Sequence, residues 1–536
     1  MQKLLLLGDE AIAQGAMDAG LSGMYAYPGT PSTEIMEYIQ RSKHAEENNI
    51  HRKWSANEKT AMEAALGMSY AGKKAMVAMK HVGLNVAADP FINSAITGVN
   101  GGLIVVSADD PSMHSSQNEQ DSRFYGKIAL IPVFEPSNQQ EAYDMAYNGL
   151  QFSEKYKVPV LLRITTRLAH SRGAVITKDV LPQNTNSLPE NPVQFVLLPA
   201  IAKKNYKRLL ENQPNFELEA EQSPYNKYFD GNDKSIGIIA FGLAYNYLIE
   251  NYKDGVPYPV LKVGQYPLPK KLVKKIANEC NELLILEEGY PIYEELIKGY
   301  LEKERVKGRL DGTIPRDGEL NPNIVAKALN IEQDYNPEIT DILTNRPPSM
   351  CMGCGHKDAY TALNEAIKTY GKGRVFSDIG CYTLGALPPY NAINSCVDMG
   401  ASITMAKGAA DAGLIPSVAV IGDSTFTHSG ITGLIDAVNS KSPITVIISD
   451  NYTTAMTGGQ DSPGLGKLEE ICKGVGVEPE HIRVFKPTKS NMDEMIKIMK
   501  EELEYNGVSV IIPRRQCIQT LKNKKLNEEL KKLGLK

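Results

Sequence analysis

Short apolar runs alternate with longer Ala-rich stretches of helical character over the first 170 residues. Runs of this length, bounded by loop-forming residues, predict buried strands. Strands that alternate with helices predict a parallel sheet with helices on both faces, so we expect a doubly wound α/β fold here. The predicted strands are residues 4–7, 24–27, 75–79, 103–106 and 158–162.

The same alternation returns near the other end of the chain. Residues 418–421 form an apolar run that ends at Gly422-Asp423-Ser424, and residues 444–448 form another that ends at Asp450-Asn451. With the helical segment between them, they predict a βαβ unit whose strands end at one edge of a sheet. Oxygen donors from Asp423 and Asn451 would lie side by side there, which suits a Mg²⁺ ion that holds a diphosphate. A plain βαβ unit, with Asp423 capping its helix, is the alternative.

The segments between these two regions are less regular, and their composition predicts a connector, a small α/β unit and a linker. The connector is rich in Asn, Pro, Gln and Lys, with some helix expected around residues 200–211. The small unit has predicted strands at 236–240, 260–263 and 283–286 and a helix at 269–280. The predicted division is residues 1–170, connector 171–233, small unit 234–306, linker 307–345, last domain 346–517 and tail 518–536.

Composition narrows the class of protein. A net charge of −5 without a basic block before the last residues argues against nucleic acid, and no apolar run approaches the ~20 residues of a membrane span. Residues 1–7 read MQKLLLL and are followed by Gly-Asp-Glu without a small-residue cleavage site, which predicts a strand rather than a signal peptide. The odd number of cysteines, seven, argues against a disulfide framework. We expect a cytoplasmic protein.

The strand ends near residue 423 resemble a known cofactor motif. Gly422-Asp423-Ser424 with a later Asn451 resembles the thiamine diphosphate motif, which usually reads Gly-Asp-Gly with a downstream Asn. The sequence departs from it at Ser424 and Asp450, and neither departure removes a metal ligand. Residues 455–460 (AMTGGQ) resemble the cofactor-binding turn of the 2-oxoacid:ferredoxin oxidoreductases. The resemblance implies Mg²⁺ bound by Asp423, Asn451 and the Thr453 carbonyl.

Four blocks in the first domain resemble the α subunit of indolepyruvate:ferredoxin oxidoreductases. They read YPGTPSTE (27–34), WSANEK (54–59), MKHVGLNVAADP (79–90) and SADDPSMHSSQNEQDSR (107–123). Their order and spacing, together with the region around Thr453, make chance agreement implausible. The resemblance implies a pyrimidine-binding domain over 1–170, a transketolase C-terminal-like domain over 234–306 and a diphosphate-binding domain over 346–517.

Two of these blocks carry candidate catalytic residues, each with a plainer alternative. Thr30 lies in a loop that opens a helix, with Pro31 expected in the first turn, and it could bind a carboxylate or only form a turn and an N-cap. Glu58 lies at the start of a predicted helix, where it could favour the helix dipole or, if buried with a raised pKa, activate a pyrimidine ring. The resemblance implies the functional roles: Thr30 for the 2-oxoacid carboxylate and Glu58 for activation. It also places site-lining side chains at His81, Asn85 and His114.

Four cysteines could hold a metal centre. Cys351 and Cys354 form a Cys-x-x-Cys pair, and Cys381 and Cys517 each follow an apolar run, at predicted strand ends on the edge described above. A [4Fe-4S] cluster, a Cys₄ zinc site and unbound thiols all remain compatible with this set. The resemblance favours the iron-sulfur cluster, because the chemistry that it implies generates electrons. The remaining cysteines, which lack such context, are Cys280, Cys396 and Cys472.

The resemblance also implies a wider set of cofactor contacts. A Gly/Ala-rich helix is expected to begin within residues 397–403, where small residues would let the backbone approach a diphosphate or simply pack against the sheet. The expected contacts are Gly422, Asp423, Ser424, Asn451, Thr453, Met456, Thr457, Gly380, Cys381, Tyr382 and Gly400.

The activity implied by the resemblance is oxidative decarboxylation of an aryl pyruvate such as indolepyruvate, with coenzyme A taking the acyl group and a ferredoxin-like acceptor taking electrons. Non-oxidative decarboxylation, and a cofactor-binding scaffold inactive without its partner, are the alternatives. Family precedent implies a small γ-type (β) subunit and a heterotetramer. Family members usually continue into a ferredoxin-like module, whereas residues 520–536 form a Lys/Leu-rich predicted helix without cysteine. We therefore expect a separate cluster-bearing electron-transfer protein as an alternative to ferredoxin.

Overall fold

The computed structural model describes residues 2–116, 118–252, 254–299, 312–313, 315, 327, 349–456 and 459–535. The chain divides into two compact units, residues 1–290 with 350–536, and residues 291–349. In the second unit the described helix is α14 (Ile292–Lys298). The predicted linker over 307–345 lies almost entirely outside the described residues. The account below concerns the first unit.

A seven-stranded sheet forms the centre of the N-terminal region, in the order β12-β6-β7-β5-β4-β2-β3. Its strands are parallel apart from β12, which pairs antiparallel with β6. Helices cover both faces, so the central strands are buried on both sides and read as continuous apolar runs. The strands are β2 (Gly23–Ala26), β3 (His51–Trp54), β4 (Ala75–Lys80), β5 (Leu103–Asp109), β6 (Val133–Phe134), β7 (Val160–Thr165) and β12 (Gln265–Tyr266).

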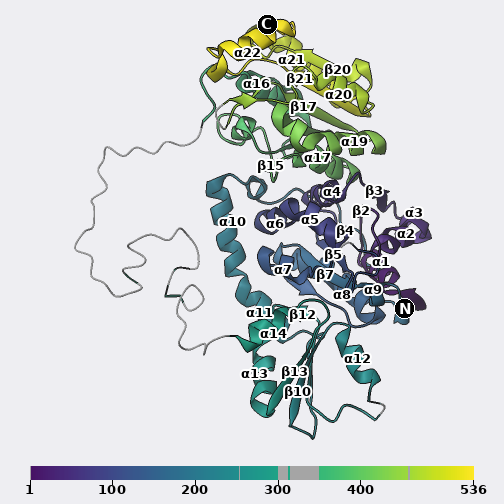
Figure 1. Ribbon diagram of the computed structural model, residues 1–536. Coiled ribbons are helices and arrows are strands. Elements are labelled where there is room, and N and C mark those ends of the chain that lie inside the picture. The colour runs from purple at the N-terminus through teal and green to yellow at the C-terminus, as the bar shows by residue number, and fades with distance from the viewer. Residues whose placement is uncertain are drawn as a thin grey trace. The chain divides into compact units, whose positions relative to one another are not determined.

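The helices divide between the two faces of this sheet (Figure 1). One face carries α1 (Gly8–Asp18), α2 (Thr33–Arg41) and α8 (Gln139–Tyr156). The other carries α4 (Glu58–Tyr70), α5 (His81–Val86), α6 (Ala88–Thr97) and α7 (Arg123–Ala129). The short helices α3 (Lys43–Glu47) and α9 (Thr166–Ala169) complete the region. The predicted doubly wound α/β class is confirmed.

The first strand departs from the prediction. Strand β1 (Lys3–Leu7) lies outside the parallel sheet and pairs antiparallel with β8 (Arg172–Ile176). Leu5 is 66% exposed, so only one side of this ribbon is covered, which an antiparallel pair tolerates and a central parallel strand does not. The prediction that residues 4–7 form a strand was therefore correct, but the prediction that this strand belongs to the parallel sheet was wrong.

The region predicted as a small α/β unit, within the first compact unit, contains a four-stranded sheet in the order β13-β10-β11-β9. Its three predicted strands are present, and β9 adds an antiparallel edge from within the predicted connector. The strands are β9 (Lys227–Phe229), β10 (Ile236–Phe241), β11 (Val260–Val263) and β13 (Glu282–Leu286). The helices of this part of the chain are η1 (Pro192–Phe195), α10 (Pro199–Glu211), α11 (Gln213–Glu221), α12 (Ala244–Glu250) and α13 (Lys270–Glu279).

A six-stranded sheet, parallel throughout, forms the centre of the C-terminal region in the order β15-β14-β16-β17-β21-β20. The strands are β14 (Val375–Ser377), β15 (Ser395–Cys396), β16 (Ser417–Gly422), β17 (Ile444–Ser449), β20 (Ile482–Phe485) and β21 (Val508–Pro513). A separate two-stranded ribbon consists of β18 (Thr453–Thr454) and β19 (Gln460–Asp461).

Helices also flank this second sheet, with α16 and α21 packed together and α17 packed against α19. The helices are α16 (Gly355–Ile367), α17 (Ala401–Asp411), α18 (Asp423–Thr425), α19 (Ile431–Ser440), α20 (Leu468–Gly474), α21 (Met492–Glu504) and α22 (Lys524–Lys532). The short 3₁₀ and π segments are η3 (Lys368–Tyr370), η4 (Cys381–Ala386), η5 (Phe426–Gly430), η6 (Pro479–His481), η7 (Lys489–Asn491) and η8 (Ile518–Thr520).

Helices α4 and α17 pack directly on each other and so join the two sheets. Two glycines allow their backbones to meet: a Cβ at Gly67 would lie 2.3 Å from the Met405 carbonyl, and one at Gly408 would lie 1.9 Å from the Ala64 carbonyl. Any larger side chain would push the helices apart. This contact brings the starts of α4 and α17, with the candidate residues Glu58 and Gly400, onto the same side of the molecule. Among the described helices, none is long and apolar enough to cross a membrane.

Candidate active site

The carboxyl edge of the six-stranded sheet presents a buried acid with an open coordination position. Asp423 directly follows β16, is 3% exposed, and its Oδ1 accepts a hydrogen bond from the Ser424 N–H (2.6 Å). Its Oδ2 is buried and has no hydrogen-bond partner among the described residues. Burial, followed by the nearby Asp450 carboxylate, raises the pKa of Asp423 to about 7. A buried carboxylate oxygen without a donor is costly, and a bound cation would satisfy it.

The loop after β17 contacts the loop after β16. The Asn451 Oδ1 accepts from the Thr453 N–H (3.2 Å), and the Thr454 hydroxyl donates to the Ser424 Oγ (2.9 Å). Thr453 is buried in the β18 ribbon, whereas Met456 is 53% exposed. The predicted contact Thr457 lies outside the described residues. The structure thus brings Asp423, Asn451 and Thr453 together, as a metal-held diphosphate would require.

Asp450, where the sequence departs from the thiamine motif, has its own partner. Its Oδ2 accepts a hydrogen bond from the Arg514 Nε (2.7 Å), and the two nitrogens of the same guanidinium donate to Glu469 (2.7 and 2.6 Å). The Asp450 carboxylate is therefore held by a cation, in contrast to Asp423. Sequence reasoning missed Arg514, although its position directly after the apolar run of β21 was a usable signal.

Two of the predicted cofactor-binding glycines pack closely against an aromatic ring. A Cβ at Gly422 would lie 2.5 Å from the Tyr382 ring, and one at Gly380 would lie 2.2 Å from it. Tyr382 is buried and its hydroxyl donates to the Asp378 carboxylate and to the Ile379 carbonyl (3.0 Å). The Tyr382 ring thus packs beneath Gly422 and Gly380, and its hydroxyl points toward Asp378 and Ile379 inside the protein.

Asp378 is a second buried acid that sequence reasoning missed. It follows β14 as Asp423 follows β16, and its Oδ2 accepts from the Ser402 hydroxyl (2.6 Å) at the start of α17. Burial raises the pKa of Asp378 to about 7. Because its oxygens already have donors, we assign it to holding the start of α17 rather than to metal binding.

A buried ion-pair network joins the start of α4 to the turn before α17. The Lys59 ammonium contacts Glu63, the Asp398 carboxylate (2.5 Å) and the Met399 carbonyl (3.0 Å). Burial opposes the charged form of Lys59, but the two acids outweigh it and raise the lysine pKa. Gly400 follows with φ 99°, a left-handed conformation that favours glycine, and a Cβ there would meet Ser429. The network fixes Glu58 relative to Gly400.

Glu58 is the first residue of α4, and Asn57 caps the helix by accepting from the Thr60 N–H (2.8 Å). The Glu58 side chain is half-buried and lies on Gly83, where an added Cβ would come within 2.6 Å of its Cγ and Oε1. Among the described residues, none donates a hydrogen bond to its carboxyl group. The group is thus positioned by the cap and by α5 and remains available to a ligand.

The other N-terminal blocks meet at the carboxyl edge of the seven-stranded sheet. The Ser115 hydroxyl donates to the Thr30 carbonyl (3.3 Å), and the Lys80 ammonium donates to the Ser115 carbonyl (3.0 Å). One ring nitrogen of His81, Nε2, lies 3.2 Å from the Asn118 carbonyl, and the buried Nδ1 has no partner among the described residues. Motifs separated by 35 to 85 residues in sequence therefore form one polar surface.

The remaining predicted lining residues lie at the rim of this surface. His114 and Asn85 are exposed, and the Asn85 Oδ1 accepts from the Tyr125 hydroxyl (2.5 Å). Thr30 is exposed, and α2 begins only at Thr33. The prediction that Pro31 lies in the first turn of the helix was therefore wrong, because Pro31 belongs to the turn before it.

Lys80 was missed by sequence reasoning. It is the last residue of β4, only 9% exposed, and no described carboxylate lies within ion-pair distance of its ammonium. A buried cation without a counter-charge is unfavourable, so an anionic ligand would compensate it. The signal was available, since Lys80 ends a buried strand directly before His81.

The four candidate cysteines follow or precede elements of the six-stranded sheet. Cys354 caps α16, Cys381 begins η4 after β14, and the Cys517 N–H donates to the Asn451 carbonyl (3.1 Å) next to the proposed metal ligand. Burial and the neighbouring sulfurs of the set raise the pKa of the Cys381 thiol to about 11. The thiols are thus close enough to interact electrostatically, at the edge that carries Asp423.

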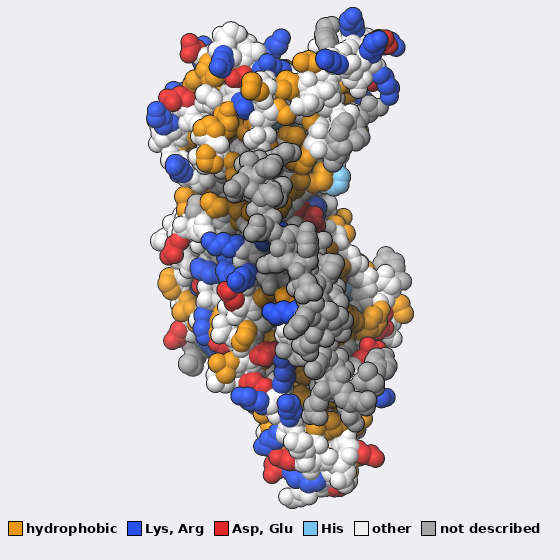
Figure 2. Space-filling view, turned by 90° about the vertical axis from the view of Figure 1, so that its left-hand side faces the viewer, with side chains coloured by type: hydrophobic (Ala, Val, Ile, Leu, Met, Phe, Trp, Pro, Cys, Tyr) orange, Lys and Arg blue, Asp and Glu red, His pale blue; other side chains and the backbone are white. Residues whose placement is uncertain are grey.

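Apolar side chains are exposed beside these cysteines. Met352, between Cys351 and Cys354, is 90% exposed, and Leu521, shortly after Cys517, is 50% exposed. On the face drawn in Figure 2, hydrophobic side chains gather in the upper part of the view, and Lys and Arg side chains lie both around them and lower down.

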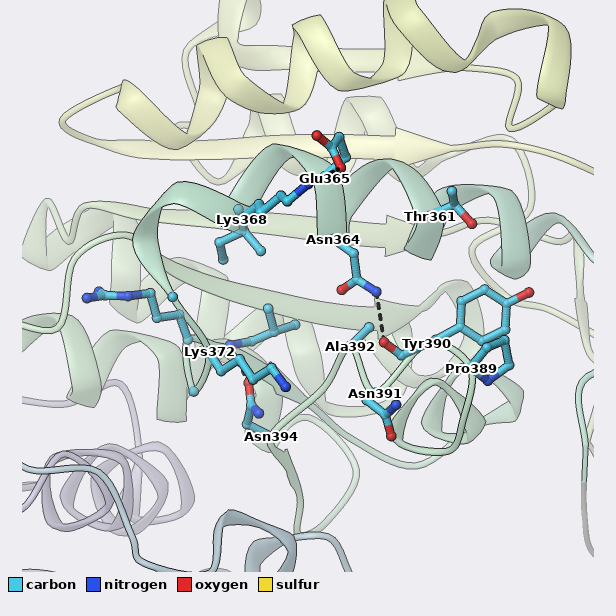
Figure 3. A pocket seen from close by; sticks show the side chains of 15 residues that line it. Thr361, Asn364, Glu365, Lys368, Lys372, Pro389, Tyr390, Asn391, Ala392 and Asn394 are labelled. Carbon is cyan, nitrogen blue, oxygen red and sulfur yellow. Dashed lines mark hydrogen bonds and ion pairs between the residues drawn. The ribbon is translucent and has the colours of Figure 1, made fainter.

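A hollow of about 620 Å³ lies elsewhere, at the amino end of β14 (Figure 3). It is lined by α16 side chains such as Asn364, which donates to the Tyr390 carbonyl (2.8 Å), and by Lys368, Lys372 and Arg374. The Arg374 guanidinium is already bonded to the Tyr370 and Ile415 carbonyls. None of the residues predicted for the site lines this hollow.

Comparison with known proteins gives the family of the chain. Residues 14–197 match the family described as pyruvate flavodoxin/ferredoxin oxidoreductase, thiamine diphosphate-binding, and residues 378–512 match the thiamine pyrophosphate enzyme C-terminal binding domain. Indolepyruvate oxidoreductase subunit IorA of Archaeoglobus fulgidus is 39% identical over 96% of this chain and 86% of its own length. The chain belongs to the IorA family. IorA of Methanothermobacter thermautotrophicus is similarly related: it is 38% identical over 96% of this chain and 87% of its own length.

A solved structure shares the fold of this IorA family member. The thiamine diphosphate-dependent 4-hydroxybenzoylformate decarboxylase of Rhodococcus jostii RHA1 aligns with a TM-score of 0.50 and 14% identity, over 96% of this chain and 100% of that one. At this identity the likeness concerns the architecture alone.

Proposed function

We propose that the chain is the large, thiamine diphosphate-binding subunit of a 2-oxoacid oxidoreductase that converts an aryl pyruvate such as indolepyruvate, with coenzyme A, to acyl-CoA and CO₂. The observation that carries this proposal is the unpartnered, buried Oδ2 of Asp423 beside Asn451, with four cysteines placed around the same sheet edge. A buried carboxylate oxygen that lacks a donor at this position suits Mg²⁺, and the cysteines suit an electron carrier.

In this proposal the two edges divide the work. Asp423, the Asn451 side chain and the Thr453 carbonyl would hold Mg²⁺ and, through it, the diphosphate. Gly422, Gly380 and Gly400 allow the close packing of the backbone at this edge, because a side chain at each would strike Tyr382 or Ser429. Bound thiamine diphosphate supplies the electron sink for decarboxylation. Glu58 would donate a hydrogen bond from its carboxylic acid to a ring nitrogen of the cofactor.

The substrate would lie on the polar surface of the N-terminal edge. Thr30 and Lys80 would bind its carboxylate, since the lysine offers a buried positive charge without a described counter-ion. His81, held by the Asn118 carbonyl, has a second ring nitrogen without a partner among the described residues, which would be available to the substrate, and Asn85 and His114 would line the rim. A carboxylate between these groups would gain charge-assisted hydrogen bonds in a partly dehydrated setting.

The chemistry proposed for the neighbouring edge favours an iron-sulfur cluster over a Cys₄ zinc site, because oxidation of the decarboxylated intermediate releases electrons and zinc has no redox chemistry. A [4Fe-4S] cluster bound by Cys351, Cys354, Cys381 and Cys517 would take these electrons singly.

The proposal includes partners. The relatives are named as subunits, and we propose a small γ-type partner subunit, arranged with this chain as a heterotetramer. Electrons would leave to ferredoxin or to a separate cluster-bearing protein. The exposed Met352 and Leu521 beside the cysteines offer an apolar docking surface for such a protein.

The test is turnover by the chain co-expressed with its small subunit under anaerobic conditions, with a viologen dye as acceptor. The balanced reaction joins one 2-oxoacid and one coenzyme A to give acyl-CoA, CO₂, a proton and two electrons. We expect dye reduction that depends on coenzyme A and is faster with indolepyruvate or phenylpyruvate than with pyruvate or 2-oxoglutarate. Aldehyde and CO₂ without dye reduction would instead indicate a non-oxidative decarboxylase, and cofactor binding without turnover would indicate a scaffold subunit.

A further inference from the structure

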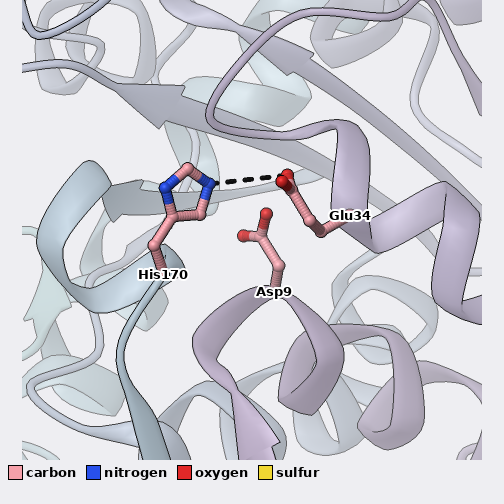
Figure 4. A group of neighbouring side chains, drawn as sticks. All are labelled: Asp9, Glu34 and His170. Carbon is pink, nitrogen blue, oxygen red and sulfur yellow. Dashed lines mark ion pairs between the residues drawn. The ribbon is translucent and has the colours of Figure 1, made fainter.

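Three ionisable side chains converge beside the N-terminal sheet, apart from the residues discussed above. Asp9 lies in the first turn of α1, Glu34 in the first turn of α2, and His170 directly after α9 (Figure 4). One carboxylate oxygen from each acid and one ring nitrogen of the histidine all lie within 4.8 Å of one another. The His170 Nε2 is 3.5 Å from the Glu34 Oε2.

Asp9 is the most informative member of this group. It is 0% exposed, and neither of its carboxylate oxygens has a hydrogen-bond partner among the described residues. The next residue shows the contrast: the Glu10 carboxylate accepts from the Leu7 N–H (2.9 Å) and pairs with Arg172 (3.1 Å). Burial removes water from Asp9 and the protein supplies no donor in return, which is unfavourable for a carboxylate. A ligand that brings positive charge would correct this.

The other two members point toward Asp9 and leave a path to solvent. The Glu34 Oε2 is buried without a hydrogen-bond partner among the described residues, and Figure 4 shows all three side chains directed into one space. The Glu34 and His170 side chains are each about a third exposed, 32% and 35%. A cation could therefore enter from this side and retain water ligands.

The donor set indicates which cation. Carboxylates alone suit Mg²⁺, Ca²⁺ and Mn²⁺, whereas imidazole suits zinc, iron, copper and nickel. A set of two carboxylates and one imidazole favours a divalent ion that accepts both donor types, such as Mn²⁺, Fe²⁺ or Zn²⁺. We propose that Asp9, Glu34 and His170 bind a divalent transition-metal cation whose coordination is completed by water.

The position of this site gives it a structural role. Glu34 opens the helix that follows the Thr30 loop, and His170 follows α9, whose Thr166 hydroxyl donates to Asp110 (2.7 Å). Asp110 in turn accepts from the Ser115 N–H (2.8 Å), and the Ser115 hydroxyl donates to the Thr30 carbonyl. The cation would thus act on the Thr30 loop twice: directly at Glu34, and through α9, Asp110 and Ser115 at the Thr30 carbonyl. The site itself does not depend on the thiamine chemistry proposed above.

The test is Mn²⁺ binding to the full chain, freed of metal and of thiamine diphosphate, followed by electron paramagnetic resonance. Mn²⁺ prefers oxygen and nitrogen donors and so avoids the cysteines. Since Asp423 and Asn451 could bind a second ion, the Asp423→Asn variant serves as the background. We expect about one Mn²⁺ per chain in this background, with a pulsed spectrum that shows coupling to an imidazole nitrogen.

Two further substitutions identify the ligands. In the same background, Asp9→Asn and His170→Gln should each weaken Mn²⁺ binding about 10-fold or more, because loss of even an outer-shell partner of a metal site costs about 10- to 100-fold. His44→Gln, a change of a histidine in α3, should leave affinity and spectrum unaltered. Mn²⁺ should also raise the midpoint of thermal unfolding in the Asp423→Asn chain and leave it unchanged once Asp9→Asn is added.

Either of two results would overturn the proposal. One is the absence of Mn²⁺ binding to the background chain, which would mean that Asp9 is neutralised by a proton instead of a metal. Alternatively, nitrogen coupling that persists in the His170→Gln variant would place the ion at another histidine. Because none of these readouts is enzymatic activity, failure of this site and failure of the proposed function remain distinguishable.

Discussion

The two sheets present their carboxyl edges in different ways. At the C-terminal edge, Asp423 directly follows β16 and Asn451 lies two residues after the end of the neighbouring β17, so strand register sets their positions. At the N-terminal edge, Glu58 begins a helix, and Thr30 lies in a loop held by Ser115 from a distant segment. The first edge therefore depends on local chain geometry and the second on tertiary contacts. A metal needs fixed ligands, whereas an organic substrate needs a surface assembled from several loops.

The two edges also differ in the charge of their buried groups. The C-terminal edge holds an acid, Asp423, with one buried oxygen that has no hydrogen-bond partner among the described residues, and the N-terminal edge holds a cation without a described counter-ion, Lys80. A buried carboxylate oxygen without a donor favours binding of a cation, and a buried cation favours binding of an anion. This difference supports the proposal that the metal and diphosphate bind at one edge and the substrate carboxylate at the other.

The largest expected effect comes from removing the proposed metal ligand. Asp423→Ala should abolish binding of thiamine diphosphate in the presence of Mg²⁺ and lower turnover by about 10³-fold or more, because metal stabilisation is worth several kcal/mol. Isothermal titration with the cofactor measures this. Asp450→Asn is the matched control at the neighbouring strand end, since Asp450 pairs with Arg514, and it should still bind the cofactor. Equal loss in both variants would contradict the assignment.

Loss of the proposed activating acid should separate catalysis from binding. Glu58→Gln keeps the shape of the side chain but removes the acid, so turnover should fall by about 10²- to 10⁴-fold while cofactor affinity changes little. Steady-state rates and cofactor titration on one preparation decide this, with Glu37→Gln on the exposed side of α2 as the control. A Glu58→Gln variant with full activity would contradict the role.

A smaller effect is expected at the proposed carboxylate site. Lys80→Met removes the buried charge and keeps the length of the side chain, so KM for the 2-oxoacid should rise about 10- to 100-fold, the range expected for a hydrogen bond to a charged group. Cofactor binding should remain. The exposed Lys127→Met variant of α7 provides the control. An unchanged KM with a lower kcat would instead place Lys80 outside the substrate site.

The smallest effect concerns the contact between the two regions and appears as a pH dependence of stability. His51 of β3 lies 3.6 Å from Asp411 of α17, and burial lowers the pKa of the histidine to about 4 despite that acid. Because the folded pKa lies below the unfolded value of about 6.5, this contribution to stability is complete above pH 6.5 and is lost as the pH falls toward 4.

The measurement is urea unfolding at pH 7 and pH 5. The free energy of unfolding of the wild type should fall between pH 7 and pH 5, and in His51→Gln this fall should be smaller by up to about 2 kcal/mol. Each pH unit below the unfolded pKa of the histidine is worth about 1.4 kcal/mol. His44→Gln is the control. Identical pH dependence in the wild type and in His51→Gln would show that His51 does not charge on unfolding.

The sequence predicted the C-terminal edge better than the N-terminal one, for a physical reason. A βαβ unit fixes which strand ends are neighbours, so the proximity of Asp423 and Asn451 followed from the apolar runs alone. The contact of Ser115 with Thr30 and Lys80 joins segments far apart in the chain, and only the family resemblance suggested that they meet. The close approach at Gly67 and Gly408 depends on helix packing that no local pattern encodes.

Individual errors have the same origin. Leu4–Leu7 reads as a buried strand, but its pairing partner, β8, lies in a segment without a strong strand pattern. Arg514 and Lys80 were missed because the role of a charged residue at a strand end depends on its neighbours in space. Arg514 pairs with Asp450, whereas no described acid pairs with Lys80, and the sequence shows neither fact.

The most direct test of the central claim is the metal content of the C-terminal edge. Iron and acid-labile sulfide are measured on anaerobically purified chain, with an electron paramagnetic resonance spectrum after reduction by dithionite. The account predicts about four irons per chain, the signal of a reduced [4Fe-4S] cluster, and loss of both in Cys354→Ser but not in Cys472→Ser. Zinc without iron would contradict the electron route proposed here, and so would iron that survives Cys354→Ser.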